Sequence, residues 1–260
     1  MTSFRERYGP WALVAGASEG LGFAFADDCA RAARRRLGRP SGAGARSARE
    51  RADPTPRRSD TRPTPRPRGA WLGGACARDR RGAADRARDP RRGLCATRRA
   101  SRPPLDELLR AIDVNVRAPL TLARELGAPM RERGRGGLIV VSSVAGLRGT
   151  ETLATYAATK AFGRVLAEGL YAELRPRGVD VLACLAGATR TPGYEATTRR
   201  DVAPVMEPRD VARATLDALG RGPVFVPGRS NRAAVWALER VLPRRVAIAL
   251  LGRSTRALNG

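Results

Sequence analysis

The chain has 260 residues and a formal net charge of +24, with 49 lysine and arginine residues against 25 acidic ones and no histidine. Its length suits one large α/β domain over residues 1–260, and its four cysteines have no metal-ligand spacing, so structural zinc and histidine-based catalysis are poor interpretations. The short, charged N-terminus carries no secretory signal and no apolar run reaches the length of a membrane span. We therefore expect a cytoplasmic protein with reduced thiols and no transmembrane segment.

The first predicted elements are a strand at residues 11–15, where the sequence is Trp-Ala-Leu-Val-Ala, and a helix at residues 21–33. A glycine-rich turn joins them, made of Gly16, Ala17, Ser18, Glu19, Gly20, Leu21 and Gly22. Such a turn lets backbone N–H groups approach a pyrophosphate at the helix N-terminus. Its place between a strand and a helix favours a dinucleotide-binding turn over a purely structural one.

Residues 29–102 do not match the rest of the chain. They hold 23 of the 49 basic residues but 6 of the 25 acidic ones, and they contain no Val, Ile, Phe, Tyr or Met. A buried parallel strand needs a β-branched or aromatic run, whereas the large apolar residues here are limited to Leu37, Trp71, Leu72 and Leu94. The composition predicts an irregular Arg/Pro-rich segment, and it lacks the aromatic platforms of a specific nucleic-acid reader.

Helices and strands alternate again after residue 102. Helical spacing predicts helices at residues 105–133, 155–174 and 208–219, and apolar runs predict strands at 137–142, 179–185 and 223–226. This alternation predicts an α/β fold with a doubly wound parallel sheet, whose second to fourth strands are doubtful because residues 29–102 would have to supply them.

Residues 231–260 are predicted to form a C-terminal helical extension. Its mixture of apolar residues and arginines suits an amphipathic cover over a substrate cleft, and a membrane-surface helix stays open as an alternative.

A second motif lies far from the glycine turn. Tyr156 and Lys160 are four residues apart, so on a helix they share one face, and the lysine charge can favour tyrosinate. Tyr156 is therefore a candidate acid/base near neutral pH. Ser143 lies thirteen positions earlier, at the C-terminal end of a predicted strand, where ligands of open α/β sheets bind. Ser142 competes for this role, but adjacent side chains on a strand face opposite ways.

The two motifs together resemble the short-chain dehydrogenase/reductase family, over roughly residues 10–28 and 103–228. The family's cofactor turn, Thr-Gly-x-x-x-Gly-x-Gly, corresponds to residues 15–22, with alanine in place of the threonine. Its active-site Ser, Tyr and Lys correspond to Ser143, Tyr156 and Lys160, and its helix-borne Asn corresponds to Asn115. Its Pro-Gly-x-x-x-Thr segment corresponds to residues 186–191, with the proline lost.

The resemblance implies a Rossmann-type, nicotinamide-dependent oxidoreductase. In this interpretation Tyr156 exchanges a proton with the substrate oxygen, Lys160 assists it, Ser143 hydrogen-bonds the reacting oxygen, and Asn115 supports a proton-relaying water. The cofactor-binding residues implied are Gly16, Ser18, Glu19, Gly20, Leu21, Gly22, Asn115, Tyr156, Lys160, Gly187, Thr189 and Thr191. The implied partners are a small-molecule carbonyl or alcohol substrate and a second copy of the chain bound through the Tyr156 helix.

The spacing across the aberrant segment is preserved. Gly22 and Asn115 are 93 positions apart, about the interval that the resembled family has between these landmarks. An inserted linker would lengthen this interval, whereas a reading frame that shifts and is later restored would not. Codons allowed for residues 36–43, read one nucleotide later, permit Gly-Leu-Asp-Val-Leu-Leu-Val, which would be the missing second strand.

We therefore hypothesise that residues 29–102 are translated out of frame. The restored string permits an arginine shortly after the second strand, and a basic residue there favours NADP(H) over NAD(H). Two alternatives stay open: a catalytically inactive relative damaged by the frameshift, and a basic nucleic-acid-binding protein that uses residues 29–102 as an arm.

Overall fold

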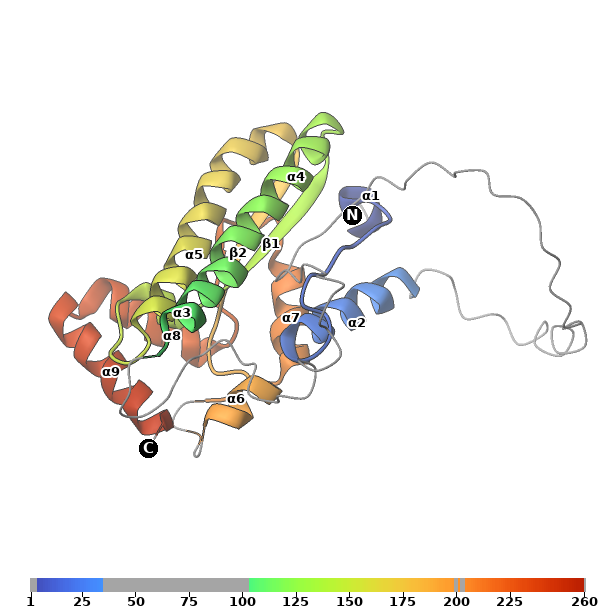
Figure 1. Cartoon of the computed structure of the whole chain (residues 1–260). Coiled ribbons are helices and arrows are strands. Elements are labelled where there is room, and N and C mark those ends of the chain that lie inside the picture. The colour runs from blue at the N-terminus through green and yellow to red at the C-terminus, as the bar shows by residue number, and fades with distance from the viewer. Residues whose placement is uncertain (1–3, 35–102, 199–200, 202–203, 260) are drawn as a thin grey trace, which may run out of the picture.

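The computed structural model of the chain describes residues 4–34, 103–198, 201 and 204–259 (Figure 1). Residues 35–102 lie outside the described part, and so does most of the prediction that residues 29–102 are irregular. The exception is the first six residues of that segment, which continue a helix. For residues 29–34 the prediction of irregular chain is therefore wrong, because helix formation needs no strand partner and can propagate from the preceding turn.

The described elements follow one another as α1 Phe4–Tyr8, α2 Gly20–Arg34, α3 Leu105–Ile112, η1 Asp113–Arg117, α4 Ala118–Glu132, β1 Gly136–Ser143, η2 Val144–Leu147, α5 Ala154–Leu174, η3 Arg175–Arg177, β2 Val179–Ala186, α6 Pro192–Thr197, α7 Pro208–Ala218, β3 Val224–Phe225, α8 Arg229–Trp236, η4 Ala237–Val241 and α9 Arg244–Asn259. The helices predicted at residues 21–33, 155–174 and 208–219 are confirmed, as are the strands at 137–142, 179–185 and 223–226. The helix predicted at 105–133 is a continuous helical run whose middle, η1, widens into a π-helical turn.

The strands form a parallel sheet in the order β1-β2-β3. β1 and β2 pair from Gly136 opposite Val179 to Ser143 opposite Ala186, and β3 pairs with Ala183 and Cys184 of β2. Because the two longer strands run in the same direction in full register, their C-terminal ends lie side by side. Whatever follows Ser143 and Ala186 is therefore brought together at one edge of the sheet.

Helices cover both faces of this sheet (Figure 1). On one face, Val179, Val181 and Ala183 of β2 pack in a core with residues of α4 and α5. On the other face, Leu182 and Cys184 pack with residues of α2 and α7. β2 is buried along its whole length, because successive side chains alternate between two apolar layers.

The strand predicted at residues 11–15 is wrong. Residues 11–14 pair with no strand, residues 15–18 form a turn, and the side chains of Trp11 and Leu13 are 52% and 42% exposed. An apolar extended segment becomes a strand only when a neighbouring backbone accepts and donates its hydrogen bonds. The sheet of the described residues consists of β1, β2 and β3, and residues 11–14 pair with none of these strands.

The C-terminal extension, residues 229–259, comprises α8, η4 and α9. Its buried residues Val235, Leu238 and Ala247 form a third core cluster with Leu147 and Leu185. The extension therefore packs on the loop that follows β1 and on the end of β2. None of the helices in the described ranges is both long and apolar enough to cross a bilayer.

Candidate active site

Tyr156 and Lys160 lie one turn apart on α5, so they share a face of the helix as their spacing predicts. The Lys160 Nζ atom is 5.6 Å from the centroid of the Tyr156 ring. The same ammonium donates a hydrogen bond of 3.2 Å to the backbone carbonyl of Val141 on β1. Both side chains are half-buried. The positive charge is thus fixed beside the phenol by a contact with the sheet.

The two adjacent serines at the end of β1 have different surroundings. Ser142 is buried, and its Oγ donates a hydrogen bond of 2.7 Å to the carbonyl of Lys160. Ser143 is half-buried, and its Oγ accepts a hydrogen bond of 3.2 Å from the N–H of Ala145, where it caps η2. The Ser142 hydroxyl therefore donates its hydrogen bond to the backbone of α5. The Ser143 hydroxyl only accepts one, so it can still donate to another acceptor.

Gly146 brings the loop after Ser143 into contact with α5. A Cβ atom on this glycine would lie 2.8 Å from the backbone nitrogen of Ala161 and 2.8 Å from the carbonyl carbon of Lys160. Real Cβ atoms do not approach backbone this closely, so the close packing depends on glycine. The loop that carries Ser143 is thereby held against the helix turn that carries Lys160.

Asn115 lies in the π-helical turn η1, a kind of turn that occurs frequently at functional sites. Its Nδ2 donates a hydrogen bond of 3.2 Å to Oγ1 of Thr159 on α5. The Thr159 hydroxyl in turn donates to the carbonyl of Tyr156 at 2.8 Å. The amide of Asn115 is therefore connected to the backbone of the Tyr156 turn through one hydroxyl group.

The glycine-rich turn leads into α2 as predicted. Gly16 and Gly20 have φ angles of +76° and +58°, in the left-handed region that favours glycine. A Cβ atom on Gly22 would lie 2.1 Å from the carbonyl oxygen of Gly16, so the helix can approach the turn only with glycine there. Ser18 and Glu19 are exposed, whereas the side chain of Leu21 packs against the core. Leu21 could therefore contact a ligand through its backbone but not through its side chain.

The segment after β2 lies beside this turn. A Cβ atom on Gly20 would be 3.2 Å from Cγ2 of Thr191. The Thr191 hydroxyl accepts a hydrogen bond of 3.2 Å from the N–H of Tyr194 and so caps α6. Thr189 is buried, and its hydroxyl donates to the carbonyl of Gly187 at 3.1 Å. The residues predicted to hold the two ends of a cofactor thus come together from distant parts of the sequence.

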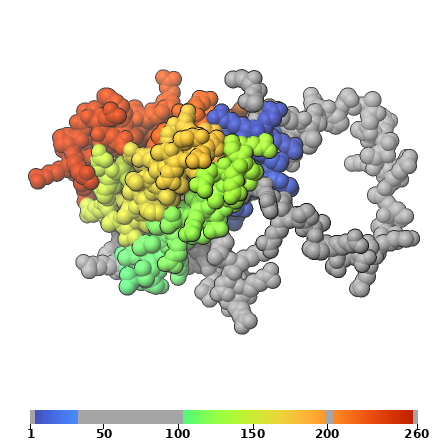
Figure 2. Space-filling model, turned by 90° about the horizontal axis from the view of Figure 1, so that it is seen from above, coloured from blue at the N-terminus to red at the C-terminus, as the bar shows by residue number. Residues whose placement is uncertain are grey.

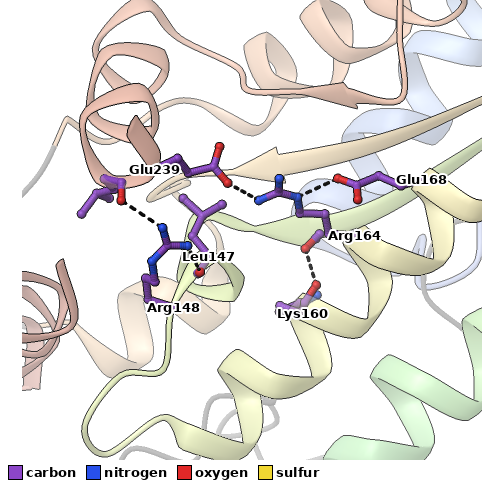
Figure 3. Close-up of polar contacts among 8 residues, drawn as sticks. Leu147, Arg148, Lys160, Arg164, Glu168 and Glu239 are labelled. Atoms are coloured by element: carbon purple, nitrogen blue, oxygen red, sulfur yellow. Dashed lines mark hydrogen bonds and ion pairs between the residues drawn. The ribbon is translucent and has the colours of Figure 1, made fainter. Parts of the chain in front are cut away.

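A cluster of polar contacts that the sequence analysis missed joins α5 to the C-terminal extension (Figure 3). Arg164, one turn beyond Lys160, donates to Glu168 at 2.8 Å and pairs with Glu239 at 2.5 Å. Arg148, in the loop after Ser143, donates to the carbonyl of Leu238 at 3.2 Å. The spacing of Arg164 and Glu168 could have indicated their pair, but no sequence signal links either to Glu239.

The two cysteines in the described ranges, Cys29 and Cys184, offer no reactive thiol near the site. Cys184 lies on β2, where burial raises the pKa of its thiol to about 11. Burial likewise raises the pKa of Cys29 on α2 to about 11. Both thiols are therefore protonated near neutral pH. No three potential metal-ligating side chains converge in the described ranges.

Comparison with known proteins gives one matching family model. Residues 93–201 match the model described as short chain dehydrogenase, a range that contains Asn115, Ser143, Tyr156, Lys160 and the segment at 187–191. The glycine turn at residues 16–22 lies outside the matched range.

Curated relatives named as a reductase and a dehydrogenase are similar to about half of this chain. The chain is 34% identical over 146 residues to a very-long-chain 3-oxoacyl-CoA reductase of Ajellomyces capsulatus, covering 54% of this chain and 42% of the relative. It is 32% identical over 143 residues to a 7beta-hydroxysteroid dehydrogenase of Clostridium sardiniense, covering 54% of each. The alignments thus span about half the length of these relatives.

The fold is similar to that of a solved 7beta-hydroxysteroid dehydrogenase, with a TM-score of 0.64, 20% identity and coverage of 96% of this chain and 100% of the other. A short-chain dehydrogenase from Sphingobium yanoikuyae in complex with NADPH has a TM-score of 0.59 at 24% identity, with coverage of 88% and 92%. At these identities the likeness establishes a Rossmann-type α/β fold.

Proposed function

Because the chain belongs to the short-chain dehydrogenase/reductase family, we propose that it transfers hydride between a nicotinamide cofactor and a carbonyl or alcohol substrate. The observation that carries the proposal is the fixed pair of Tyr156 and Lys160, with the Ser143 loop packed against the Lys160 turn. We place this activity in the cytoplasm, where the free thiols of Cys29 and Cys184 would stay reduced.

The glycine turn suits the pyrophosphate of a dinucleotide. A Cβ atom would clash with backbone at Gly22 and would be tightly packed against Thr191 at Gly20. With glycine at these positions, backbone N–H groups can come close to a ligand. Gly16, Ser18, Glu19, Gly20, Leu21 and Gly22 would hold the pyrophosphate, and Gly187, Thr189 and Thr191 would line the nicotinamide side. When bound, the cofactor supplies the hydride, and the protein positions and moves protons.

In the reducing direction, Tyr156 donates its phenolic proton to the carbonyl oxygen of the substrate; in the oxidising direction it removes the proton from the alcohol. The Lys160 ammonium, held by the Val141 carbonyl, favours the tyrosinate that this exchange requires. Ser143 donates a hydrogen bond to the reacting oxygen. This is possible because its Oγ only accepts a hydrogen bond from Ala145. Asn115, linked to the Tyr156 turn through Thr159, supports the proton path to Lys160.

We propose an apolar carbonyl compound as substrate and NADP(H) as the preferred cofactor. Two relatives are named for 3-oxoacyl-CoA and 7beta-hydroxysteroid chemistry, and both names denote lipophilic substrates. The preference for NADP(H) rests on the arginine that the restored reading frame permits.

An absorbance assay tests the proposed activity with NADPH or NADH, a steroid ketone and a small polar ketone such as dihydroxyacetone. We expect cofactor oxidation that depends on the steroid ketone, matched one to one by alcohol product. In the protein with the restored reading frame, an arginine contact with the additional phosphate should make kcat/KM at least about tenfold higher with NADPH than with NADH. Failure of every ketone to cause oxidation of either cofactor would contradict the proposed function.

One observation favours an inactive relative as the second candidate. Residues 29–102 lack the residues of buried strands, and among the described residues β1 has no strand on its outer edge. The strands expected there would carry the adenine side of the cofactor site. A chain without them would keep Tyr156 and Lys160 but hold the cofactor weakly.

We propose that two copies of the chain associate through the layer formed by α3, α4 and α5. Large apolar side chains are exposed on these helices, with Leu105 at 69%, Leu109 at 50%, Leu120 at 46% and Val165 at 64%. α4 and α5 lie side by side on the outside of the sheet (Figures 1 and 2). Such a set of exposed apolar side chains is characteristic of a contact between proteins.

Sedimentation velocity of Val165→Glu tests the association. A charge buried at an apolar contact is costly, so we expect this variant to be monomeric and the parent chain to be dimeric. Val241→Glu is the matched control, because Val241 is 57% exposed in the C-terminal extension, away from this layer. A monomeric parent chain, or a Val165→Glu variant that stays dimeric, would contradict the proposal.

A further inference from the structure

The C-terminal extension exposes large apolar side chains around its central turn. Trp236 is 62% exposed, Val241 57% and Val246 44%. Trp236 ends α8, Val241 ends η4, and Val246 lies in the first turn of α9, so all three lie within eleven residues of one another. Pro243, in the turn between the two helical runs, is also exposed.

The charge around these side chains is of one sign. Residues 229–260 contain seven arginines and a single acidic residue, Glu239. Glu239 is already paired with Arg164 of α5. Within the part of the chain that the structure describes, Arg256 is the one of the seven that forms an ion pair, with Glu151. The remaining six are Arg229, Arg232, Arg240, Arg244, Arg245 and Arg253.

This surface is held in place from beneath. Val235, Leu238 and Ala247 are buried in the third core cluster. The Arg164–Glu239 ion pair and the hydrogen bond from Arg148 to Leu238 tie η4 to the body of the protein (Figure 3). Leu238 is buried and Glu239 is paired with Arg164, whereas the neighbouring Trp236, Arg240 and Val241 are exposed to solvent.

We propose that this surface docks on an anionic lipid bilayer, with Trp236, Val241 and Val246 in the interface and Arg240, Arg244 and Arg245 on lipid phosphates. Tryptophan suits the boundary between apolar chains and polar headgroups, and aliphatic side chains add burial. Arginines beside the membrane are attracted by anionic lipid. A nucleic acid would use the arginines and could stack on Trp236, but it would leave the two valines without a partner. The proposal is independent of the chemistry at Tyr156.

The first test reports on Trp236 in the full-length chain carrying Trp11→Phe and Trp71→Phe, so that Trp236 is the single tryptophan. The probes are vesicles of phosphatidylcholine, with and without phosphatidylserine, and brominated phosphatidylcholine in the same mixtures. We expect the emission of Trp236 to shift to the blue and to be quenched by bromine with the anionic vesicles. Emission that stays unchanged, while the protein sediments with those vesicles, would overturn the proposal.

The second test separates the extension from the arginines of residues 29–102, which could attract anionic vesicles by charge alone. Trp236→Ser combined with Val241→Ser keeps every charge, and we expect its partition onto anionic vesicles to fall by at least about tenfold. Phe23→Ser, on α2, is the control for loss of an exposed apolar side chain, because Phe23 is 58% exposed and lies outside both the extension and the α3–α5 layer, and it should leave partition unchanged. An equal loss in the control, or no loss in the double variant, would overturn the proposal.

The arginines are tested by charge reversal. Arg244→Glu combined with Arg245→Glu should weaken vesicle binding more than Arg131→Glu combined with Arg133→Glu, which changes the net charge equally at the end of α4. Loss of binding to duplex DNA by the first pair with unchanged vesicle binding would identify a nucleic-acid surface and refute the membrane proposal. A change in sedimenting mass with unchanged vesicle binding would instead identify a contact between copies of the chain and would refute it equally.

Discussion

Replacing Tyr156 with phenylalanine is expected to lower kcat by roughly 10²–10⁴-fold, the usual contribution of a positioned proton donor. The substitution removes the hydroxyl and leaves the ring beside the Lys160 ammonium, which is 5.6 Å from the ring centroid. The glycine turn and the Thr191 segment are untouched, so the affinity for the cofactor should be largely retained. Steady-state turnover and a fluorescence titration of NADPH, measured on both proteins, separate the two effects.

Tyr171→Phe is a matched control on the same helix. Tyr171 is half-buried, and the guanidinium of Arg175 lies 5.1 Å from its ring centroid, so it too pairs an aromatic ring with a cation. We expect this variant to keep its turnover. Full activity in Tyr156→Phe would exclude Tyr156 as the proton donor, and an equal loss in Tyr171→Phe would show that the effect comes from a disturbed helix.

The elements predicted correctly from the sequence are those whose signal is local. The apolar run of β2 reflects burial on both faces, and the spacing of apolar residues along α7 reflects one buried side. The segment at residues 11–15 has the same kind of local signal but forms no strand, because pairing decides whether a strand forms and pairing depends on residues far away in the sequence. The widening of the helix at η1 also has no local signal that periodicity can detect.

The site was predictable to the extent that it depends on spacing. A spacing of four positions places Tyr156 and Lys160 on one helix face, and the alternation of a strand separates Ser142 from Ser143. The hydrogen bonds that distinguish the two serines join residues on different elements, at Lys160 and Ala145, and no sequence pattern specifies them. The pair of Arg164 with Glu239 likewise depends on how the C-terminal extension packs on α5.

Restoring the reading frame across codons 29–102 is expected to raise thermal stability and cofactor affinity together, since we propose that this segment is translated out of frame. Ordering the backbone costs about 1–2 kcal/mol for each residue, and burial must offset this cost. The segment offers four large apolar side chains over 74 residues, counted from Leu37, Trp71, Leu72 and Leu94 between positions 29 and 102. Arginine stems cover surface, but their charges resist burial.

A segment translated in the correct frame would supply a strand that pairs with residues 11–14. Trp11 and Leu13 are 52% and 42% exposed, and a strand pairing beside them would bury side chains worth roughly 1.5–3 kcal/mol each. It would also supply the adenine side of the cofactor site, so NADPH should raise the melting temperature of the corrected protein by binding the folded state. The chain of the present sequence should show a lower melting temperature and little response to NADPH.

Thermal melting of both proteins, with and without cofactor, tests the frameshift hypothesis. If the present sequence melts as cooperatively as the corrected one and gains as much from NADPH, its Arg/Pro-rich segment contributes to the fold and the frameshift hypothesis is wrong.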